Sequence, residues 1–300
     1  MEFFHNHPGE FAALLTAFFW TITALSFESA ANRIGSLSLN IIRLVIGLVF
    51  LSVFTLIRRG ALLPVDASSE NWLWLVLSGL VGFVFGDLFL FKSYTIIGSR
   101  FSMLIMTLVP PITAFFSFFI IGERLTFFHY LGMSVTFSGI SLAIFSRKEK
   151  GVRISLKLAP RGILYALGGA VGQALGLVLS KLGMKDYDPF AATQIRIIAG
   201  IAGFALLAVF MSRWGAVINA LKDRAGMKAT ALGAFFGPFL GVSFSLVAVK
   251  YTQAGVASTI MALVPVLIIV PAVVLYRQKV TLREVAGAII SVAGVALFFI

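Results

Sequence analysis

The chain has 300 residues, of which 59% are hydrophobic and 12% are charged, and its mean hydropathy is +1.01. This composition excludes a soluble globular domain and is typical of a protein that lies in a lipid bilayer. The net charge of +12 does not indicate a nucleic-acid partner, because Lys and Arg lie between the apolar runs, where the positive-inside rule and anionic lipid account for them.

The apolar runs, taken in chain order, predict the transmembrane helices. A bilayer core about 30 Å thick requires roughly 20 apolar residues for each helical crossing. Runs such as 73–90 are apolar on every face, which argues against the alternating pattern of a β-barrel strand. We therefore predict an all-α integral membrane protein with ten transmembrane helices, multi-pass in the cell inner membrane or plasma membrane. The ten runs cover residues 10–31, 38–58, 71–92, 99–121, 126–145, 161–182, 189–212, 229–249, 256–276 and 282–300.

An internal repeat divides the chain into two halves. A shift of 155 residues aligns the end of the first half with the end of the second without a gap, and it pairs Met106 with Met261 and Pro110 with Pro265. Because each half has an odd number of spans, the second half enters the membrane from the opposite side, and the repeat is inverted. The predicted units are a five-helix repeat over 1–148, a basic linker over 149–160 and a second five-helix repeat over 161–300.

The paired prolines lie inside apolar runs, Pro110 in MTLVPPITAFFSFF and Pro265 in MALVPVLIIVPAVV. Proline removes one backbone hydrogen bond and kinks a membrane helix. Inverted repeats with interrupted helices in corresponding positions are typical of secondary transporters, whose substrate site lies near the midplane between the halves. We interpret both prolines as helix-kink residues beside a central pathway. Kinks that serve helix packing alone are the alternative.

Several stretches carry a resemblance to a known family. They are AFFWTIT in the first run, an arginine early in the second and seventh runs, KYTQAGVASTIMALVPV across the eighth and ninth, and IGERLTFFHYLGMSVTFSGISLAIF from the fourth into the fifth. Over nearly its whole length the chain resembles the ten-span EamA-type branch of the drug/metabolite transporter superfamily. It departs from the family pattern at Arg277-Gln278, which replace a Gly-Glu pair, and at Thr21, which replaces a frequent glycine. The resemblance implies transport of a small solute and favours efflux of an amino acid or related metabolite, without naming the substrate.

Asp87 is the first candidate for a functional residue, because a charge at the bilayer centre costs about 3 kcal/mol and ionisable groups inside spans are therefore rare. It could carry a coupling proton or attract a cationic substrate. The alternative is an acid near the membrane interface that pairs with Lys92 or with a base on another helix. The repeat counterpart of Asp87 is Val242, so the two halves differ at this position.

Arg43 and Arg196 occupy related positions in the second and seventh runs, in NIIRLVIG and TQIRIIAG. Each lies only a few residues inside its run, so one interpretation is that both side chains extend to the lipid headgroups. The other is that both face inward and bind a carboxylate or phosphate, which suits the guanidinium group.

Other side chains could line a cavity. Gln173 lies among glycines whose spacing favours close helix packing, but a buried amide needs partners that a substrate could supply. Trp20 lies on a candidate cavity face of the first run. Met106 and Met261 are adaptable side chains that suit varied apolar solutes, with lipid contact as the alternative. Glu123 is expected to have a structural role, either capping the next helix or pairing with the neighbourhood of Arg124.

The sequence gives no support to several classes of enzyme. It contains no HExxH, GxSxG or GxxxxGK[ST] motif and no cysteine. We expect neither a cofactor nor a metal. The favoured function is a secondary active transporter that exports a small molecule by alternating access, with membrane lipid around it and a proton as the candidate coupling ion. A membrane-embedded lipid-modifying enzyme and a non-transporting scaffold are the alternatives, and the sequence is compatible with a homodimer.

The sidedness of the termini is left open. Ten spans place both termini on one side of the membrane. The count of Lys and Arg then puts the basic linker in the cytoplasm and the termini outside, whereas the family resemblance implies cytoplasmic termini.

Overall fold

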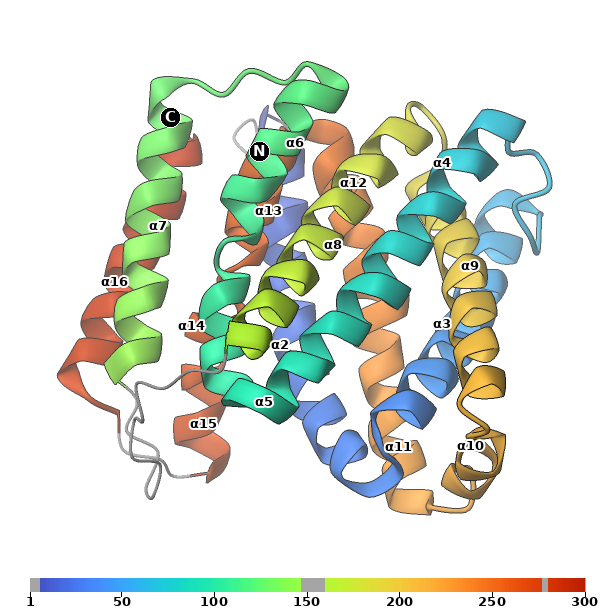
Figure 1. Ribbon diagram of the computed structural model, residues 1–300. Helices are drawn as coiled ribbons and strands as arrows, with labels where there is room; N and C mark the ends of the chain where they lie inside the picture. The colour runs from blue at the N-terminus through green and yellow to red at the C-terminus, as the bar shows by residue number, and fades with distance from the viewer. Residues whose placement is uncertain (1–5, 147–159, 277–279, 300) are drawn as a thin grey trace.

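The computed structural model describes residues 6–146, 160–276 and 280–299, and over these ranges it contains helices and no strand (Figure 1). The all-α fold predicted from the sequence is therefore confirmed. The basic linker predicted over 149–160 lies outside the described residues apart from Pro160, which begins a helix. Arg277 and Gln278, which depart from the family pattern, also lie outside them.

Apart from the boundary between the third and fourth runs, the helices of the first half begin and end close to the predicted runs. Its first helix is longer than the run that predicted it, because it begins directly at a proline, a residue well suited to the first turn. The helices are α2 (Pro8–Ile34), α3 (Ser36–Arg59), α4 (Ser69–Gly79), the π-helical segment η1 (Leu80–Gly86), α5 (Asp87–Met106), α6 (Val109–Ile121) and α7 (Phe127–Ser146).

The second half repeats this order and adds a short surface helix, α10. Within the described residues, nine helices are long and apolar enough to cross a bilayer, and α6 is a shorter apolar helix that supplies the tenth. The helices are α8 (Pro160–Met184), α9 (Pro189–Phe210), α10 (Trp214–Ala220), α11 (Arg224–Ala234), the π-helical segment η2 (Phe235–Gly241), α12 (Val242–Tyr251), α13 (Ala254–Met261), α14 (Val264–Leu267), α15 (Ile269–Tyr276), α16 (Leu282–Ala296) and the 3-10 turn η3 (Leu297–Phe299).

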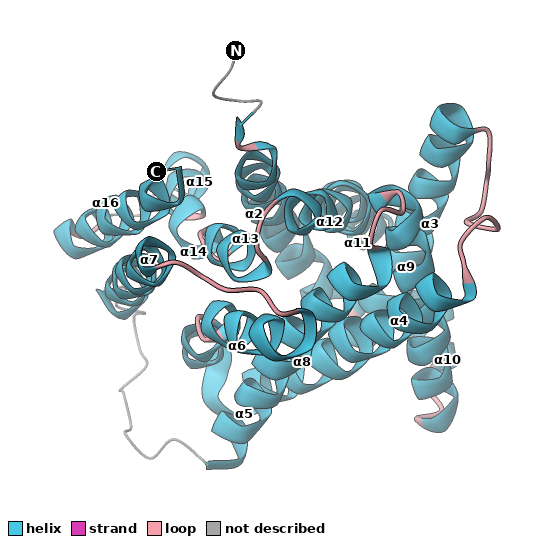
Figure 2. Ribbon diagram, turned by 90° about the horizontal axis from the view of Figure 1, so that it is seen from above, coloured by secondary structure: helices cyan, strands magenta, loops and turns pink. Residues whose placement is uncertain are grey.

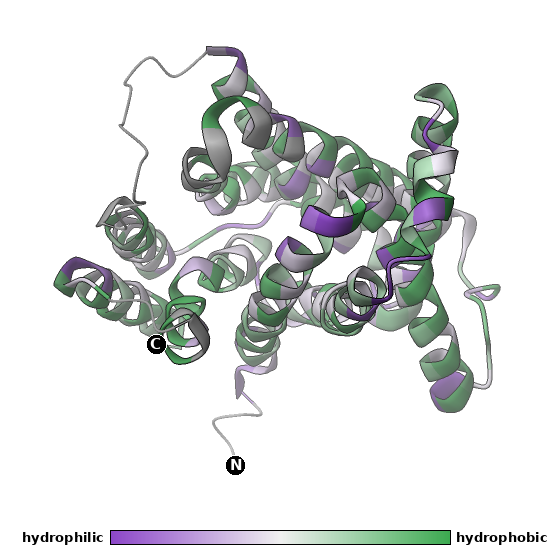
Figure 3. Ribbon diagram, turned by 90° about the horizontal axis from the view of Figure 1, so that it is seen from below, coloured by the Kyte–Doolittle hydropathy of each residue, from purple (hydrophilic) through white to green (hydrophobic). Residues whose placement is uncertain are grey.

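The start of α2 and the end of η3 lie on the same side of the bundle, and the end of α7 and the start of α8 lie toward the opposite side (Figure 1). Seen from above, α7 and α16, the last spans of the two halves, lie side by side at one end of the molecule (Figure 2). Glycines allow this contact, because a Cβ at Gly132 would lie 2.9 Å from the carbonyl oxygen of Gly294. The outer helices are largely apolar (Figure 3), and exposed side chains such as Phe119 and Phe210 suit contact with lipid.

One predicted boundary is wrong. The sequence suggested a break between the third and fourth spans at residues 93–98, but the structure assigns helix there and α5 continues to Met106. The interruption falls at Thr107 and Leu108, directly before α6. Its position follows from Pro110, because a proline has no backbone N–H to donate to the carbonyl four residues earlier, which here belongs to Met106 at the end of α5.

The two interrupted helices match each other in detail. α5 ends at Met106 and α13 ends at Met261, and Pro110 and Pro265 each lie in the first turn of the next helix. In both breaks the backbone amide of a leucine donates a hydrogen bond to the carbonyl oxygen of the residue three positions earlier. The nitrogen–oxygen distance is 2.9 Å in the first half and 3.1 Å in the second. Each break is therefore a single tight turn of 3-10 type that redirects the chain.

Two π-helical segments form a further matched pair. η1 and η2 each span seven residues and lie 155 positions apart, and each ends at a glycine, Gly86 and Gly241. A π-helical turn accommodates an extra residue within a helix and is found frequently at functional sites. These π-helical segments are not among the elements predicted from the sequence. Asp87 follows η1 directly, so this distortion sets the position of its side chain.

Candidate functional site

Asp87, the first residue of α5, is buried with 8% of its surface exposed. Arg43 of α3 places its Nη2 2.5 Å from Oδ2 of Asp87, forming an ion pair. Gln173 of α8 donates from Nε2 to Oδ1 of Asp87 at 2.9 Å. We call these three residues the charged cluster. Arg43 and Asp87 belong to the first half and Gln173 to the second, so the cluster joins the two halves inside the membrane.

Arg43 does not extend to the headgroups, which corrects one interpretation of the sequence. Its side chain is only 15% exposed, and its guanidinium lies over the ring of Phe27 of α2, with 5.4 Å from Cζ to the ring centroid. Asp87 pairs with this base on another helix, as one of the two interpretations of that residue proposed. The carboxylate of Asp87 offsets part of the cost of burying the guanidinium of Arg43 in this orientation.

Glycines bring the backbone of η1 against α8 at the cluster. A Cβ on Gly172 would lie 2.8 Å from Cα of Gly86, and one on Gly86 would lie 3.3 Å from the amide nitrogen of Gln173. Gln173 also donates to the carbonyl oxygen of Gly82 at 3.3 Å. The glycine stripe of the sixth span therefore serves close helix packing, and that packing places Gln173 within reach of Asp87.

Removing one member of this buried ion pair is expected to be costly. Loss of one partner from a buried pair leaves an uncompensated charge and typically costs about 3–5 kcal/mol, whereas replacing both partners by apolar groups is often nearly neutral.

Arg196 of α9 is also buried, with 5% of its surface exposed, so the headgroup interpretation is wrong for this residue too. Its guanidinium lies 4.9 Å from the ring centroid of Phe83 in η1. No ion pair or side-chain hydrogen bond joins it to a described residue, and its buried Nε has no partner there. A desolvated cation–π contact contributes about 2 kcal/mol or somewhat more, which offsets only part of the several kcal/mol that burial of an ion costs. Within the described residues, Arg196 is thus a charge without a counter-ion.

The repeat explains this difference between the two arginines. Arg43 and Arg196 occupy related positions in the two halves, but the position that carries Asp87 in the first half carries Val242 in the second. Val242 is buried, with 8% of its surface exposed. The first half therefore supplies a carboxylate for its arginine, and the second half has a hydrocarbon side chain at the related position.

The other candidates lie outside the hydrogen bonds of the charged cluster. Trp20 packs against Gly241 at the end of η2, where a Cβ would lie 2.5 Å from its Nε1. Met106 is half-buried and Met261 is buried, each directly before a helix break. The structure therefore does not bring the tryptophan or either methionine into the cluster.

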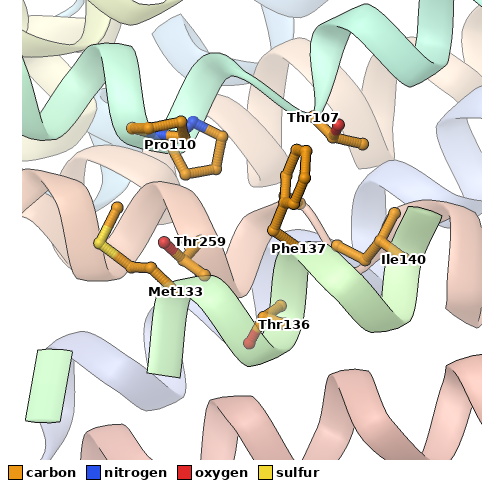
Figure 4. Close-up of a pocket in the computed structure, with 9 residues that line it drawn as sticks. Thr107, Pro110, Met133, Thr136, Phe137, Ile140 and Thr259 are labelled. Carbon is orange, nitrogen blue, oxygen red and sulfur yellow. The ribbon is translucent and has the colours of Figure 1, made fainter. Parts of the chain in front are cut away.

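A small cavity lies beside both helix breaks. Thr107 and Pro110 approach it from the first break and Thr259 from the end of α13, while α7 closes the opposite side (Figure 4). Its size suits about one water molecule. The side chains that line it are Thr107, Pro110, Pro111, Met133, Thr136, Phe137, Ile140, Thr259 and Ala262.

A second polar group joins the halves at the side of the membrane where the termini lie. Lys181 of α8 lies 2.5 Å from Oε1 of Glu123 and donates to the carbonyl oxygen of Thr252 at 2.6 Å. The hydroxyl of Thr252 donates to Glu10 of α2 at 2.6 Å. We call Glu10, Glu123, Lys181 and Thr252 the terminal network. It connects α2 and the turn after α6 with α8 and the turn before α13.

The terminal network corrects the expectation for Glu123. Its carboxylate accepts a hydrogen bond from the backbone amide of Ala254 at 2.9 Å, so it caps α13 of the second half and not the next helix in the chain. Glu10 and Lys181 were missed in the sequence. A lysine near the end of an apolar run reads as an interfacial anchor, and only the fold brings Glu123 to it.

Comparison with known proteins identifies the family of this chain. The model of the EamA-like transporter family matches residues 7–145 and again residues 160–300. Two proteins of Bacillus subtilis (strain 168) are similar. The uncharacterized transporter YyaM is 26% identical over 231 residues, covering 75% of this chain and 72% of its own. The uncharacterized transporter YvbV is 27% identical over 191 residues, which cover 63% of this chain and 59% of YvbV.

The fold is also found in a solved crystal structure of a protein that has 19% sequence identity with this chain, a TM-score of 0.77, and coverage of 98% of this chain and 96% of the other. The repeated family match agrees with the two halves seen in the fold. The family match makes the chain a multi-pass transporter of the cell membrane with a small-molecule substrate. The chain belongs to the EamA-like transporter family, within the drug/metabolite transporter superfamily.

Proposed function

We propose that this transporter is secondary active and exports a small metabolite, such as an amino acid or a related solute, by alternating access. The charged cluster is the observation that carries this proposal. Its hydrogen bond from Gln173 to Asp87 crosses between the halves inside the bilayer, where an inverted-repeat transporter has its substrate and coupling sites. Relative movement of the halves would therefore be linked to the charge on Asp87.

A proton on Asp87 is the coupling event that we propose. The groups facing this carboxylate are the guanidinium of Arg43 and the amide of Gln173. An ionised Asp87 holds both groups, whereas a protonated Asp87 releases Arg43 and weakens the link to α8. Proton binding would thus favour a different arrangement of the halves, and a proton gradient would drive the cycle.

The terminal network is the proposed gate on the side of the termini. Lys181 and Glu123 belong to different halves, and their ion pair, with the hydrogen bond between Thr252 and Glu10, closes this end. Alternating access requires these contacts to break when the pathway opens to that side. The side chains of Lys181 and Glu123 are only 24% and 11% exposed, so this pair would break only as part of the larger movement that opens this end to water.

The test is an untargeted comparison of metabolites inside and outside cells that express the wild-type protein, Asp87→Asn or Glu70→Gln. Glu70 is an exposed acid paired with Lys185 and is the matched control. We expect the wild type and the control to accumulate one solute class outside, at a rate that depends on external pH. Asp87→Asn should lower this rate about tenfold or more and remove the pH dependence.

Other outcomes would count against parts of the proposal. Unchanged transport and pH dependence in Asp87→Asn, at equal amounts of folded protein in the membrane, would reject Asp87 as the proton site. No change in any small solute for the wild type would reject export. Analysis of the lipids would then test the lipid-modifying alternative, and a protein without either effect would be a scaffold.

A further inference from the structure

We infer that Arg196 binds a carboxylate group of the transported solute. This inference rests on the proposed function, because the ligand is taken to be the solute that the protein transports. Its basis is a buried arginine, 5% exposed, whose guanidinium has no anionic partner among the described residues. A buried ion without a partner is strongly unfavourable, so such a group is retained where a ligand neutralises it during function.

The count of charges agrees with a single carboxylate. The buried arginines at related positions of the two halves are Arg43 and Arg196, and Asp87 supplies one negative charge to them. One positive charge is therefore left over in this part of the bundle. A ligand with one carboxylate would neutralise it, whereas a cationic ligand would add to the excess.

The surroundings of Arg196 favour a planar anion. Phe83 covers a face of the guanidinium, so the N–H groups at its edge remain for hydrogen bonds in the plane. Carboxylates accept two parallel bonds from this edge. Gly82 keeps the adjacent backbone close, because a Cβ at this position would lie 3.4 Å from Nη2 of Arg196.

The same glycine links the inferred carboxylate site to the charged cluster. Gly82 contacts Arg196, and its carbonyl oxygen accepts the hydrogen bond from Gln173, which also bonds Asp87. A carboxylate bound at Arg196 would therefore lie next to the groups that respond to the proton on Asp87. Because Arg196 is buried, the ligand would enter only after the halves separate around it.

The binding test uses purified protein in detergent and thermal unfolding as the readout. The probes are the standard L-amino acids, each compared with its carboxamide, together with inorganic phosphate. We expect at least one amino acid to raise the unfolding temperature of the wild type and its carboxamide to have little effect. Arg196→Gln and Arg196→Met should bind that amino acid about thirtyfold more weakly, as expected when one partner of a buried charge pair is removed.

Arg33→Met is the matched control, because Arg33 is a half-exposed arginine at the end of α2. It should bind the same amino acid as tightly as the wild type. Equal effects of acids and carboxamides on the wild type, stabilisation by phosphate alone, no stabilisation by any probe, or unchanged affinity in the Arg196 variants would each overturn the inference.

The two buried arginines also provide a comparison without ligand. Arg196→Met should leave the unfolding temperature unchanged or raise it, because it removes an uncompensated charge. Arg43→Met should lower it, because it leaves Asp87 unpaired. An equal loss in both variants would show that Arg196 has a structural counter-ion and would overturn the inference.

Failure of the inference and failure of the proposed function are distinguishable. Carboxylate binding that depends on Arg196, without transport in cells, would uphold the site and reject export. Export of a solute that lacks a carboxylate would uphold export and overturn the site.

Discussion

Gln173 and Asp87 are joined by a hydrogen bond of 2.9 Å although they lie 86 residues apart, in different halves of the chain. The bond exists because α8 approaches η1 along a stripe of glycines. Asp87 therefore connects two interactions of different kinds, an ion pair within its own half and a hydrogen bond to the other half. A change in its charge would alter both.

The first prediction concerns the bond between the halves. Gln173→Leu should lower transport about tenfold, because it leaves Oδ1 of Asp87 and the carbonyl oxygen of Gly82 without their donor, at a cost of about 1–3 kcal/mol. Ser138→Ala is the control, since the exposed Ser138 donates to the carbonyl oxygen of Ser134 within α7. Uptake into vesicles with a proton gradient is the measurement, and equal rates for Gln173→Leu and the control would contradict the role of this bond.

The second prediction concerns the ion pair. Arg43→Met and Asp87→Leu should each lower the free energy of unfolding by about 3 kcal/mol, because each leaves a buried charge unpaired. The double variant should lose much less than the sum, since neither charge then remains. Unfolding in detergent, measured for all four proteins of the cycle, gives the coupling. Additive losses would show that the two groups act independently.

The third prediction concerns the contact between α8 and η1. Gly172→Ala should destabilise the protein by about 1–3 kcal/mol, because its Cβ would lie 2.8 Å from Cα of Gly86. Gly215→Ala in α10 is the matched control, since a Cβ there has no neighbour within 4 Å. The unfolding temperatures of the two variants are compared. A stable Gly172→Ala protein would show that the helices can separate at this point without loss.

The fourth prediction concerns the contact between α6 and α13, which belong to different halves of the chain. The hydroxyls of Thr113 on α6 and Ser258 on α13 lie 3.4 Å apart across the two halves, and the natural chain has no cysteine. A Thr113→Cys, Ser258→Cys double variant should form a disulfide with an oxidant and stop transport, and a reductant should restore it. Each single variant is a control. Transport that continues in the crosslinked protein would show that the halves do not separate here.

Glu123→Gln in the same cysteine pair tests the terminal network. Loss of the ion pair with Lys181 should open this end more often and lower the rate of crosslinking. Glu70→Gln, at an exposed ion pair of the same membrane side, should leave the rate unchanged. An unchanged rate in Glu123→Gln would remove the terminal network as the gate.

The sequence by itself determined the helices and the repeat. Runs of apolar residues are local, so their lengths predicted the spans, and Pro110 and Pro265 marked the helix breaks because proline acts on its own backbone. The boundary expected at residues 93–98 was wrong because a short polar segment does not by itself end a helix. The paired π-helical segments leave no simple local pattern, since they depend on how neighbouring helices pack.

The tertiary structure decided how the polar side chains are partnered. The sequence named Arg43, Asp87 and Gln173 separately, and only the approach of three helices brings them into one cluster. The packing of the helices also buries Arg196 without a counter-ion among the described residues. Its position near the end of an apolar run would equally suit an arginine at the membrane interface. The physical reason is that the partner of a buried charge is set by contacts between distant segments, whereas hydrophobic length and backbone chemistry belong to each segment alone.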